Sequence, residues 1–219
     1  MILDPGFGWT LDDYRFSLTQ FLSNDYHVSS FSDYFDSQKQ KHLILRHDVD
    51  FSLEPALAIA KIDQSIGVSS SFFLRVHAKN YNLFSVDGIK TASMIVNLGH
   101  EVSLHLEEGI DRVSKQSKWD VLDAQKVAFE KILGIQIRGF AAHEPVRFGG
   151  FETSMEAKKR WNLEYHAYEE RFTTQMKYLS DSSGRWREKP VVSFVNTFDK
   201  IQLLTHPIWW YQATPQENF

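Results

Sequence analysis

The chain has 219 residues, of which 42 % are hydrophobic and 24 % charged, proportions that are ordinary for a globular protein able to bury a sizeable core. Its formal charge of −4 gives no reason to expect nucleic acid or an anionic membrane surface as a partner. The sequence contains no cysteine, which excludes disulfides and thiolate zinc sites, so a metal would have to bind to histidine and carboxylate side chains.

The start of the chain, MILDPGFGWTLDDYRF, has no basic segment and no long apolar run, so we expect no signal peptide. No later stretch approaches the length of a membrane span, and the expected location is the cytoplasm. Residues 10–13 resemble a capping box, and apolar residues follow at helical spacing, which predicts a helix over 11–23. Residues 27–37, HVSSFSDYFDS, read as a short connector.

Strand and helix patterns then alternate along the chain. Strands are predicted at 42–46, 68–75, 100–105 and 135–142, and helices at 53–66, 86–98 and 118–133. Each of these helices ends at a glycine that leads directly into the next strand. Weaker patterns predict a helix over 152–161 and extended segments at 163–168, 177–181 and 199–206. This alternation favours parallel βαβ units in a single α/β domain covering residues 1–219, either a barrel or a doubly wound sheet.

Acidic and imidazole side chains occur where the predicted strands end. The residues at or just past these carboxyl ends are Asp48, Asp50, His105, His143, Asp181 and His206. Because the carboxyl ends of parallel strands share one face, which is where active sites are built, we expect these groups to converge. The sequence therefore predicts a metal or acid–base site on this rim. Glu107 and Glu108, next along from one of these ends, are expected in a solvated loop.

Several of these residues also have a purely structural interpretation. Asp50 could support the N-terminus of helix 53–66, although Ser52 already fits as its N-cap. Asp181 lies in SDSSG, which is good turn chemistry. His206 could pack against Trp209 as a core histidine. It is the coincidence of all six residues on one face that favours a functional site.

Aromatic residues make up 14 % of the chain, and most of them are expected in the core. The cluster HPIWWY at 206–211 is the exception, because tryptophans beside a polar site often form a platform on which a sugar stacks. Trp209 and Trp210 are therefore predicted to bind substrate.

Three motifs in order, LRHDVDFS, GHEVSLH and LLTHP, resemble the polysaccharide deacetylase family, the NodB-like carbohydrate esterases of family 4. They resemble in particular a branch that carries RHDVD in place of the more usual TFDDG. The resemblance runs from about residue 10 to residue 211, which is nearly the whole chain. It implies a distorted (β/α) barrel with about seven parallel strands. It also implies hydrolysis of N-acetyl groups on amino sugars with a divalent metal, expected to be zinc.

The resemblance assigns roles to four residues. Asp48 matches the general base, and Asp50 matches the metal-binding aspartate. His105 matches the first histidine of the family's H-x-x-x-H metal motif, and His206 matches the late histidine that acts as general acid.

The chain departs from the family pattern in two places. The second histidine of H-x-x-x-H would fall at Gly109, and we take His143, in AAHEP, as the candidate replacement ligand. The family's Arg-Pro motif is absent. We expect Arg46, beside both carboxylates, to hold Asp48 ionised, and Asp181 to keep His206 protonated.

The leading hypothesis is a metal-dependent hydrolase that removes an N-acetyl or O-acetyl group from a sugar of a cell-surface polysaccharide, lipopolysaccharide or precursor. One alternative is a glycosidase that uses Asp48 or Asp50 with Asp181. Another is a degenerate barrel that binds a sugar through Trp209, Trp210 and Tyr211 without turning it over.

Overall fold

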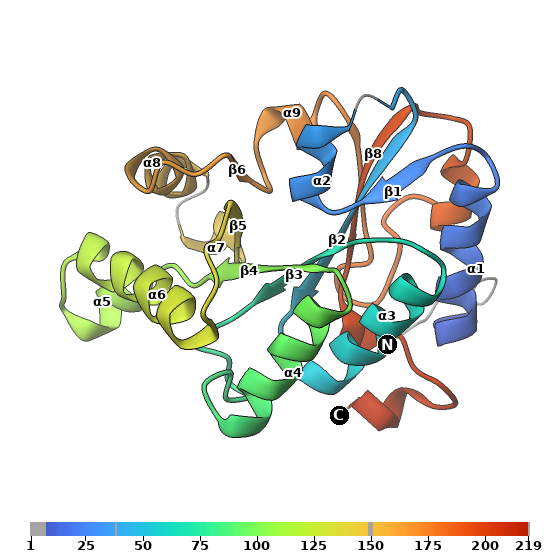
Figure 1. The fold of residues 1–219 in the computed structure, drawn as a ribbon. Helices are drawn as coiled ribbons and strands as arrows, with labels where there is room; N and C mark the ends of the chain where they lie inside the picture. The colour runs from blue at the N-terminus through green and yellow to red at the C-terminus, as the bar shows by residue number, and fades with distance from the viewer. Residues whose placement is uncertain (1–7, 38, 149–150, 219) are drawn as a thin grey trace.

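Parallel strands in the order β6-β5-β4-β3-β2-β8-β7 form the central sheet of the protein. The structure is a computed structural model, and it describes residues 8–37, 39–148 and 151–218. The sheet curls into a half-barrel with helices around it, and β1 pairs with the first residues of β2 (Figure 1). The strands are β1 (His27–Ser29), β2 (His42–Val49), β3 (Ser71–Leu74), β4 (Glu101–Leu106), β5 (Gly139–Ala142), β6 (Tyr165–His166), β7 (Lys177–Ser180) and β8 (Lys200–Thr205). The predicted barrel of about seven parallel strands is confirmed.

Helices connect successive strands, as the alternating pattern predicts. They are α1 (Leu11–Leu22), α2 (Phe31–Asp36), α3 (Leu53–Ser65), α4 (Val86–Asn97), α5 (Ile110–Ser114), α6 (Lys118–Leu133), α7 (Pro145–Phe148), α8 (Glu152–Arg160) and α9 (Glu170–Thr173), with 3-10 turns η1 (Val191–Phe194), η2 (Pro207–Trp209) and η3 (Pro215–Asn218). The capping box of α1 is present, with the Thr10 side chain accepting from the backbone of Asp13. Among the described helices, none is long and apolar enough to span a bilayer.

Several boundaries predicted from the sequence are wrong. The strands predicted at 68–75 and 135–142 are shorter in the structure, where β3 is Ser71–Leu74 and β5 is Gly139–Ala142. The segment 27–37, expected to be a connector, contains β1 and α2. Ser29 pairs with Ile44 of β2, and Ser30 is the N-cap of α2, so these serines do not form a turn. Strand β2 runs three residues past its predicted end at 46, to Val49. It continues because β3 pairs with Arg46–Val49 and supplies backbone partners beyond the apolar run.

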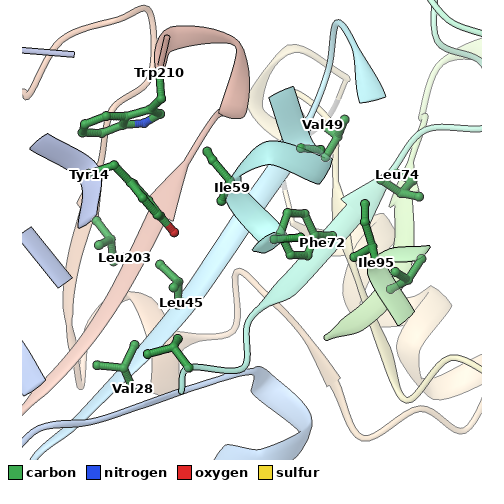
Figure 2. Packing of buried hydrophobic residues seen from close by; sticks show 14 of the residues in the cluster. Tyr14, Val28, Leu45, Val49, Ile59, Phe72, Leu74, Ile95, Leu203 and Trp210 are labelled. Atoms are coloured by element: carbon green, nitrogen blue, oxygen red, sulfur yellow. The ribbon is translucent and has the colours of Figure 1, made fainter. Parts of the chain in front are cut away.

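Alternate residues of β2 face two different layers of the core. Leu43, Leu45 and Val49 pack against the helices, in the layer where Figure 2 shows Leu45 and Val49 beside Phe72 and Ile59. Ile44 packs inside the curl of the sheet. Because side chains alternate along a strand, Arg46 and Asp48 share the inner face with Ile44. The strand therefore carries both charged groups into the hollow of the half-barrel, where β2 is buried over its whole length.

Candidate active site

Arg46 and Asp48 form a buried pair on the inner face of β2. Nε and Nη2 of Arg46 donate to the two oxygens of Asp48 at 2.8 and 2.7 Å, and the Arg46 guanidinium lies 4.3 Å from the ring centre of Tyr168. Asp48 is only 3 % exposed. Burial alone would raise the pKa of Asp48, but the guanidinium outweighs it and holds that pKa below its usual value. Asp48 is therefore an ionised carboxylate at neutral pH.

Asp50, the first residue after β2, is surrounded by three imidazoles. Its Oδ1 lies 3.3 Å from Nε2 of His105 and 3.7 Å from Nε2 of His143, while its Oδ2 lies 3.7 Å from Nε2 of His206. Burial would raise the pKa of Asp50, but the neighbouring imidazoles, His105 first, hold it below its usual value. Oδ1 is buried and accepts no hydrogen bond from any residue that the structure describes.

The imidazoles of His105 and His143 are oriented by contacts on their far sides. Nδ1 of His105, on β4, lies 3.1 Å from the carbonyl oxygen of Ala141. Nδ1 of His143, just after β5, lies 3.3 Å from the Glu107 carboxylate. In both rings the contact with an acceptor at Nδ1 leaves Nε2 facing Asp50, the arrangement common for metal-binding histidines.

His206, just after β8, is held by Asp181, just after β7. The backbone N–H of His206 donates to both oxygens of Asp181 at 2.9 and 3.0 Å, and its Nδ1 lies 2.6 Å from Oδ1. Nε1 of Trp210 donates to Oδ2 at 3.0 Å, and Asp181 is 0 % exposed. Burial would lower the pKa of His206, but Asp181 outweighs it and raises that pKa to about 9.

Within residues 8–37, 39–148 and 151–218, no group of three or more His, Asp or Glu side chains is already arranged to hold a metal ion. Whether the site could bind one therefore depends on the individual distances between its donor atoms. The donor atoms to compare with a zinc site are Oδ1 of Asp50, which has no hydrogen-bond partner among the described residues, and Nε2 of His105 and His143. Zinc bonds of about 2.0–2.1 Å give a tetrahedron with edges of roughly 3.3–3.4 Å. The distances of 3.3 and 3.7 Å from Oδ1 to His105 and His143 lie close to those edges. One carboxylate and two imidazoles are also a donor set that zinc accepts, so these residues fit the ion.

The charges at the rim are unbalanced in favour of a cation. The carboxylates are Asp48, Asp50, Glu107 and Asp181, and the guanidinium groups are Arg46 and Arg75. With the protonated His206 counted beside the two guanidinium groups, one negative charge remains in excess in a partly desolvated site, a sign that favours the binding of a cation.

Comparison with solved structures shows what fold this is. The chain matches BA3943, a CE4 family pseudoenzyme from Bacillus anthracis, with 18 % identity and a TM-score of 0.52 over 83 % of this chain and 58 % of that one. It matches the Streptococcus pyogenes deacetylase PplD with 12 % identity and a TM-score of 0.51 over 93 % and 82 % of the two chains. It matches a mutant of the peptidoglycan deacetylase PdaC from Bacillus subtilis with 16 % identity and a TM-score of 0.50 over 82 % and 80 %. The chain has the NodB-like fold of the CE4 polysaccharide deacetylases.

The likeness is one of fold, because every identity is low and no family model or curated protein matches the sequence. The chain spans less than three fifths of the length of BA3943. On the NodB-like fold, all six predicted residues converge as expected: Asp48 and Asp50 from β2, His105 from β4, His143 from β5, Asp181 from β7 and His206 from β8. Asp48 lies inside its strand rather than beyond it.

The predicted sugar-stacking role of Trp210 does not agree with its position. Trp210 is 1 % exposed, and the rings of Trp9 and Trp186 lie 5.0 and 6.3 Å from it, so too little of its ring is accessible for a sugar to stack on it. Its indole N–H supports Asp181 instead. Trp209 is partly buried and packs against the same core.

Two further residues at this rim, Glu107 and Arg75, were not predicted from the sequence to belong to the site. Glu107, expected in a solvated loop, contacts His143, and Arg75, just after β3, pairs with Glu107. Glu108, expected in the same loop, is buried against Ser154. The signal that could have found Glu107 and Arg75 is the one used for the other residues, since both follow the carboxyl end of a strand.

Proposed function

We propose that the protein is a metal-dependent hydrolase that removes an acetyl group from a sugar of a cell-surface polysaccharide, lipopolysaccharide or precursor. The observation that carries the proposal is the orphaned carboxylate oxygen of Asp50 facing Nε2 of His105 and His143, next to a second, ionised carboxylate. The fold supports the choice of reaction, because PplD and PdaC, which share it, are deacetylases.

Asp50, His105 and His143 would hold the ion, with zinc the expected metal. When bound, a divalent ion supplies a Lewis acid that polarises the acetyl carbonyl and lowers the pKa of a water molecule to about 7. Three protein ligands leave a coordination position open, which is the usual arrangement of a catalytic zinc site.

Asp48 and His206 would carry the protons. In the reaction the oxygen of water bonds to the acetyl carbon, the bond from that carbon to the sugar nitrogen breaks, and acetate and an amine leave. Asp48, kept ionised by Arg46, accepts a proton from the water. His206, kept protonated by Asp181, gives a proton to the departing nitrogen, which an amide needs because an amine anion is a poor leaving group.

A cleft borders the start of α3 and the segment after η2, and none of the five residues proposed to bind the ion or carry protons lines it. It has a volume of about 650 Å³ and begins at Phe51, the residue after Asp50. Asn80, Tyr211 and Gln212 also line it, so aromatic and hydrogen-bonding side chains are both present. This composition suits a carbohydrate, whose rings have apolar faces and hydroxyl edges.

The glycosidase alternative is disfavoured by Asp181. Its carboxylate is fully buried and bonded to His206 and Trp210, so it cannot reach a glycosidic oxygen as a second catalytic carboxylate. The degenerate sugar-binding barrel is a sharper competitor, because BA3943 has the same fold and is a pseudoenzyme. The fold alone is therefore not sufficient evidence for hydrolase activity, and the proposal depends on the donor atoms around Asp50.

The test is a product analysis on N-acetylated oligosaccharides with protein supplied with zinc. We expect acetate and free amine in equal amounts and no new reducing ends. New reducing ends would identify a glycosidase, and sugar binding without either product would identify the degenerate barrel.

A further inference from the structure

Gly109 stands where the resemblance places the second histidine of the metal motif, and it cannot supply a nitrogen. It has φ of 85°, in the left-handed region, and it precedes the short helix α5. The chain turns away at this point, so a second imidazole has to come from another strand. His143 fills the place from the end of β5, where its backbone N–H donates to the carbonyl oxygen of Leu106 at 2.8 Å.

An imidazole taken from a loop needs to be fixed in direction and tautomer. Nδ1 of His143 lies 3.4 Å from Oε1 and 3.3 Å from Oε2 of Glu107. A carboxylate at Nδ1 keeps the proton on that nitrogen and leaves the lone pair on Nε2. Nε2 is the atom that faces Asp50.

Glu107 is itself held from two sides. Nη2 of Arg75 donates to its Oε2 at 2.5 Å, and the two side chains are only 13 % and 14 % exposed. The side-chain amide of Gln125, on α6, fixes the Glu107 backbone, accepting from its N–H at 3.0 Å and donating to its carbonyl at 2.8 Å. A clamp of this kind sets where the carboxylate points, because both backbone groups of one residue are bound to one rigid helix side chain.

We propose that Glu107 is a positioning residue that fixes His143 as the replacement metal ligand, with Arg75 and Gln125 holding Glu107. The inference rests on the proposed function, since it assumes a metal on Asp50, His105 and His143. In this arrangement His143, fixed by Glu107, takes the place of the histidine that the resemblance puts at Gly109. Glu107 does not coordinate the ion in this arrangement. It acts through Nδ1 of His143, while Arg75 offsets its charge.

The experiment is a double-mutant cycle read out as zinc affinity, by competition with a chromophoric chelator. Glu107→Gln should weaken zinc binding by about 10–100-fold, the effect usual for a residue behind a metal ligand. His143→Gln should weaken it more. In the His143→Gln background, Glu107→Gln should change the affinity by less than about twofold, because its only route to the ion has been removed.

The matched control is Glu108→Gln. Glu108 is the next residue, is also buried, and faces Ser154 on α8 rather than the site. This variant should bind zinc like the wild type. Equal affinity of the wild type and Glu107→Gln would overturn the positioning role while leaving the proposed function intact. A wild-type protein that binds no zinc would overturn both.

The tautomer of His143 gives a second readout, measured on the wild-type protein. Two-bond ¹H–¹⁵N spectra of the zinc-loaded wild-type protein, assigned by comparison with His143→Gln, show which ring nitrogen of His143 carries a proton. We expect the proton on Nδ1. A proton on Nε2 would contradict the inference, because that nitrogen could then not bind the ion.

Discussion

Asp181 binds His206 three times, accepting from its backbone N–H with both oxygens and lying 2.6 Å from its Nδ1. The residues follow β7 and β8, which pair in parallel, so the sheet itself sets them side by side. This contact raises the pKa of His206 to about 9 even though burial opposes it. The imidazole is therefore protonated at neutral pH, which is the state that a general acid needs.

The pH dependence of activity should show this contact. Because the pKa of His206 is raised, the protonated form persists below about pH 9 and is lost as the pH rises through that value. The profile of kcat/KM should therefore have a basic limb near pH 9. Asp181→Asn should move that limb to lower pH, since it removes the negative charge that holds the proton. A limb that stays in place in Asp181→Asn would contradict the assignment.

The choice of substrate separates a general acid from a positioning role for His206. His206→Ala should cost about 10²–10⁴-fold in hydrolysis of an acetamide. It should cost far less with an activated aryl acetate, because that leaving group needs no proton. Equal losses on the two substrates, measured as kcat/KM, would show that His206 only positions other groups.

Asp48 and Asp50 should separate into two distinct roles. Asp48→Asn is expected to retain zinc and lose about 10²-fold or more in kcat, because it removes a base and not a ligand. Asp50→Asn is expected to lose the metal. Metal content and kcat measured on both variants check the assignment. Loss of metal in Asp48→Asn would mean that the two roles are exchanged.

Stability should depend strongly on Arg46. Arg46→Met leaves the Asp48 carboxylate buried without its partner and should lower the free energy of unfolding by about 3–5 kcal/mol, measured by urea denaturation. The matched control is Arg138→Met. Arg138 donates two hydrogen bonds to Glu164 with the same geometry, but at the surface of the protein. Arg138→Met should therefore lower the free energy of unfolding by about 1 kcal/mol or less. Equal costs for the two variants would refute the role of burial.

The sequence predicts this site because the parallel fold makes strand ends meet, and that rule needs no knowledge of side-chain contacts. The rule also applies to Glu107, which directly follows β4, but two adjacent glutamates look solvated, so Glu107 was expected in a loop. The clamp from Gln125 that draws Glu107 inward is a contact between residues 18 positions apart. The predicted sugar-stacking role of Trp210 was wrong for a similar reason, because Trp9 and Trp186, which are distant in the sequence, pack against its ring.

The fold was predictable where patterns are long and missed where they are short. The predicted helix over 118–133 matches α6 residue for residue, ending at Gly134 in the left-handed conformation. Strand β1 has three residues and owes its existence to pairing with β2. The extension of β2 through Asp48 likewise depends on β3 beside it, which no local pattern encodes.

Acid should destabilise the fold through His42. Burial, helped by His27, lowers the pKa of His42 to about 4, and its Nδ1 has no hydrogen-bond partner in the described part of the chain. His42 in the unfolded chain thus binds a proton as the pH falls below about 6.5, whereas His42 in the folded protein binds one only below about pH 4. The free energy of unfolding should fall by roughly 3 kcal/mol across this window through His42. His42→Gln should flatten the dependence, and His27→Gln should reduce it only in part, because burial, the larger cause of the lowered pKa of His42, remains. An equally steep slope in His42→Gln would contradict this.

The dependence of acetate release on bound zinc tests the central claim most directly. Protein stripped of metal is titrated with zinc, and acetate release from an N-acetylated oligosaccharide is measured at each step. Activity should be absent at the start, rise in proportion to zinc, and stop rising at one ion per chain, with no response in His105→Ala. Full activity without metal, or a protein that binds no zinc, cobalt or nickel at micromolar concentration, would contradict the account.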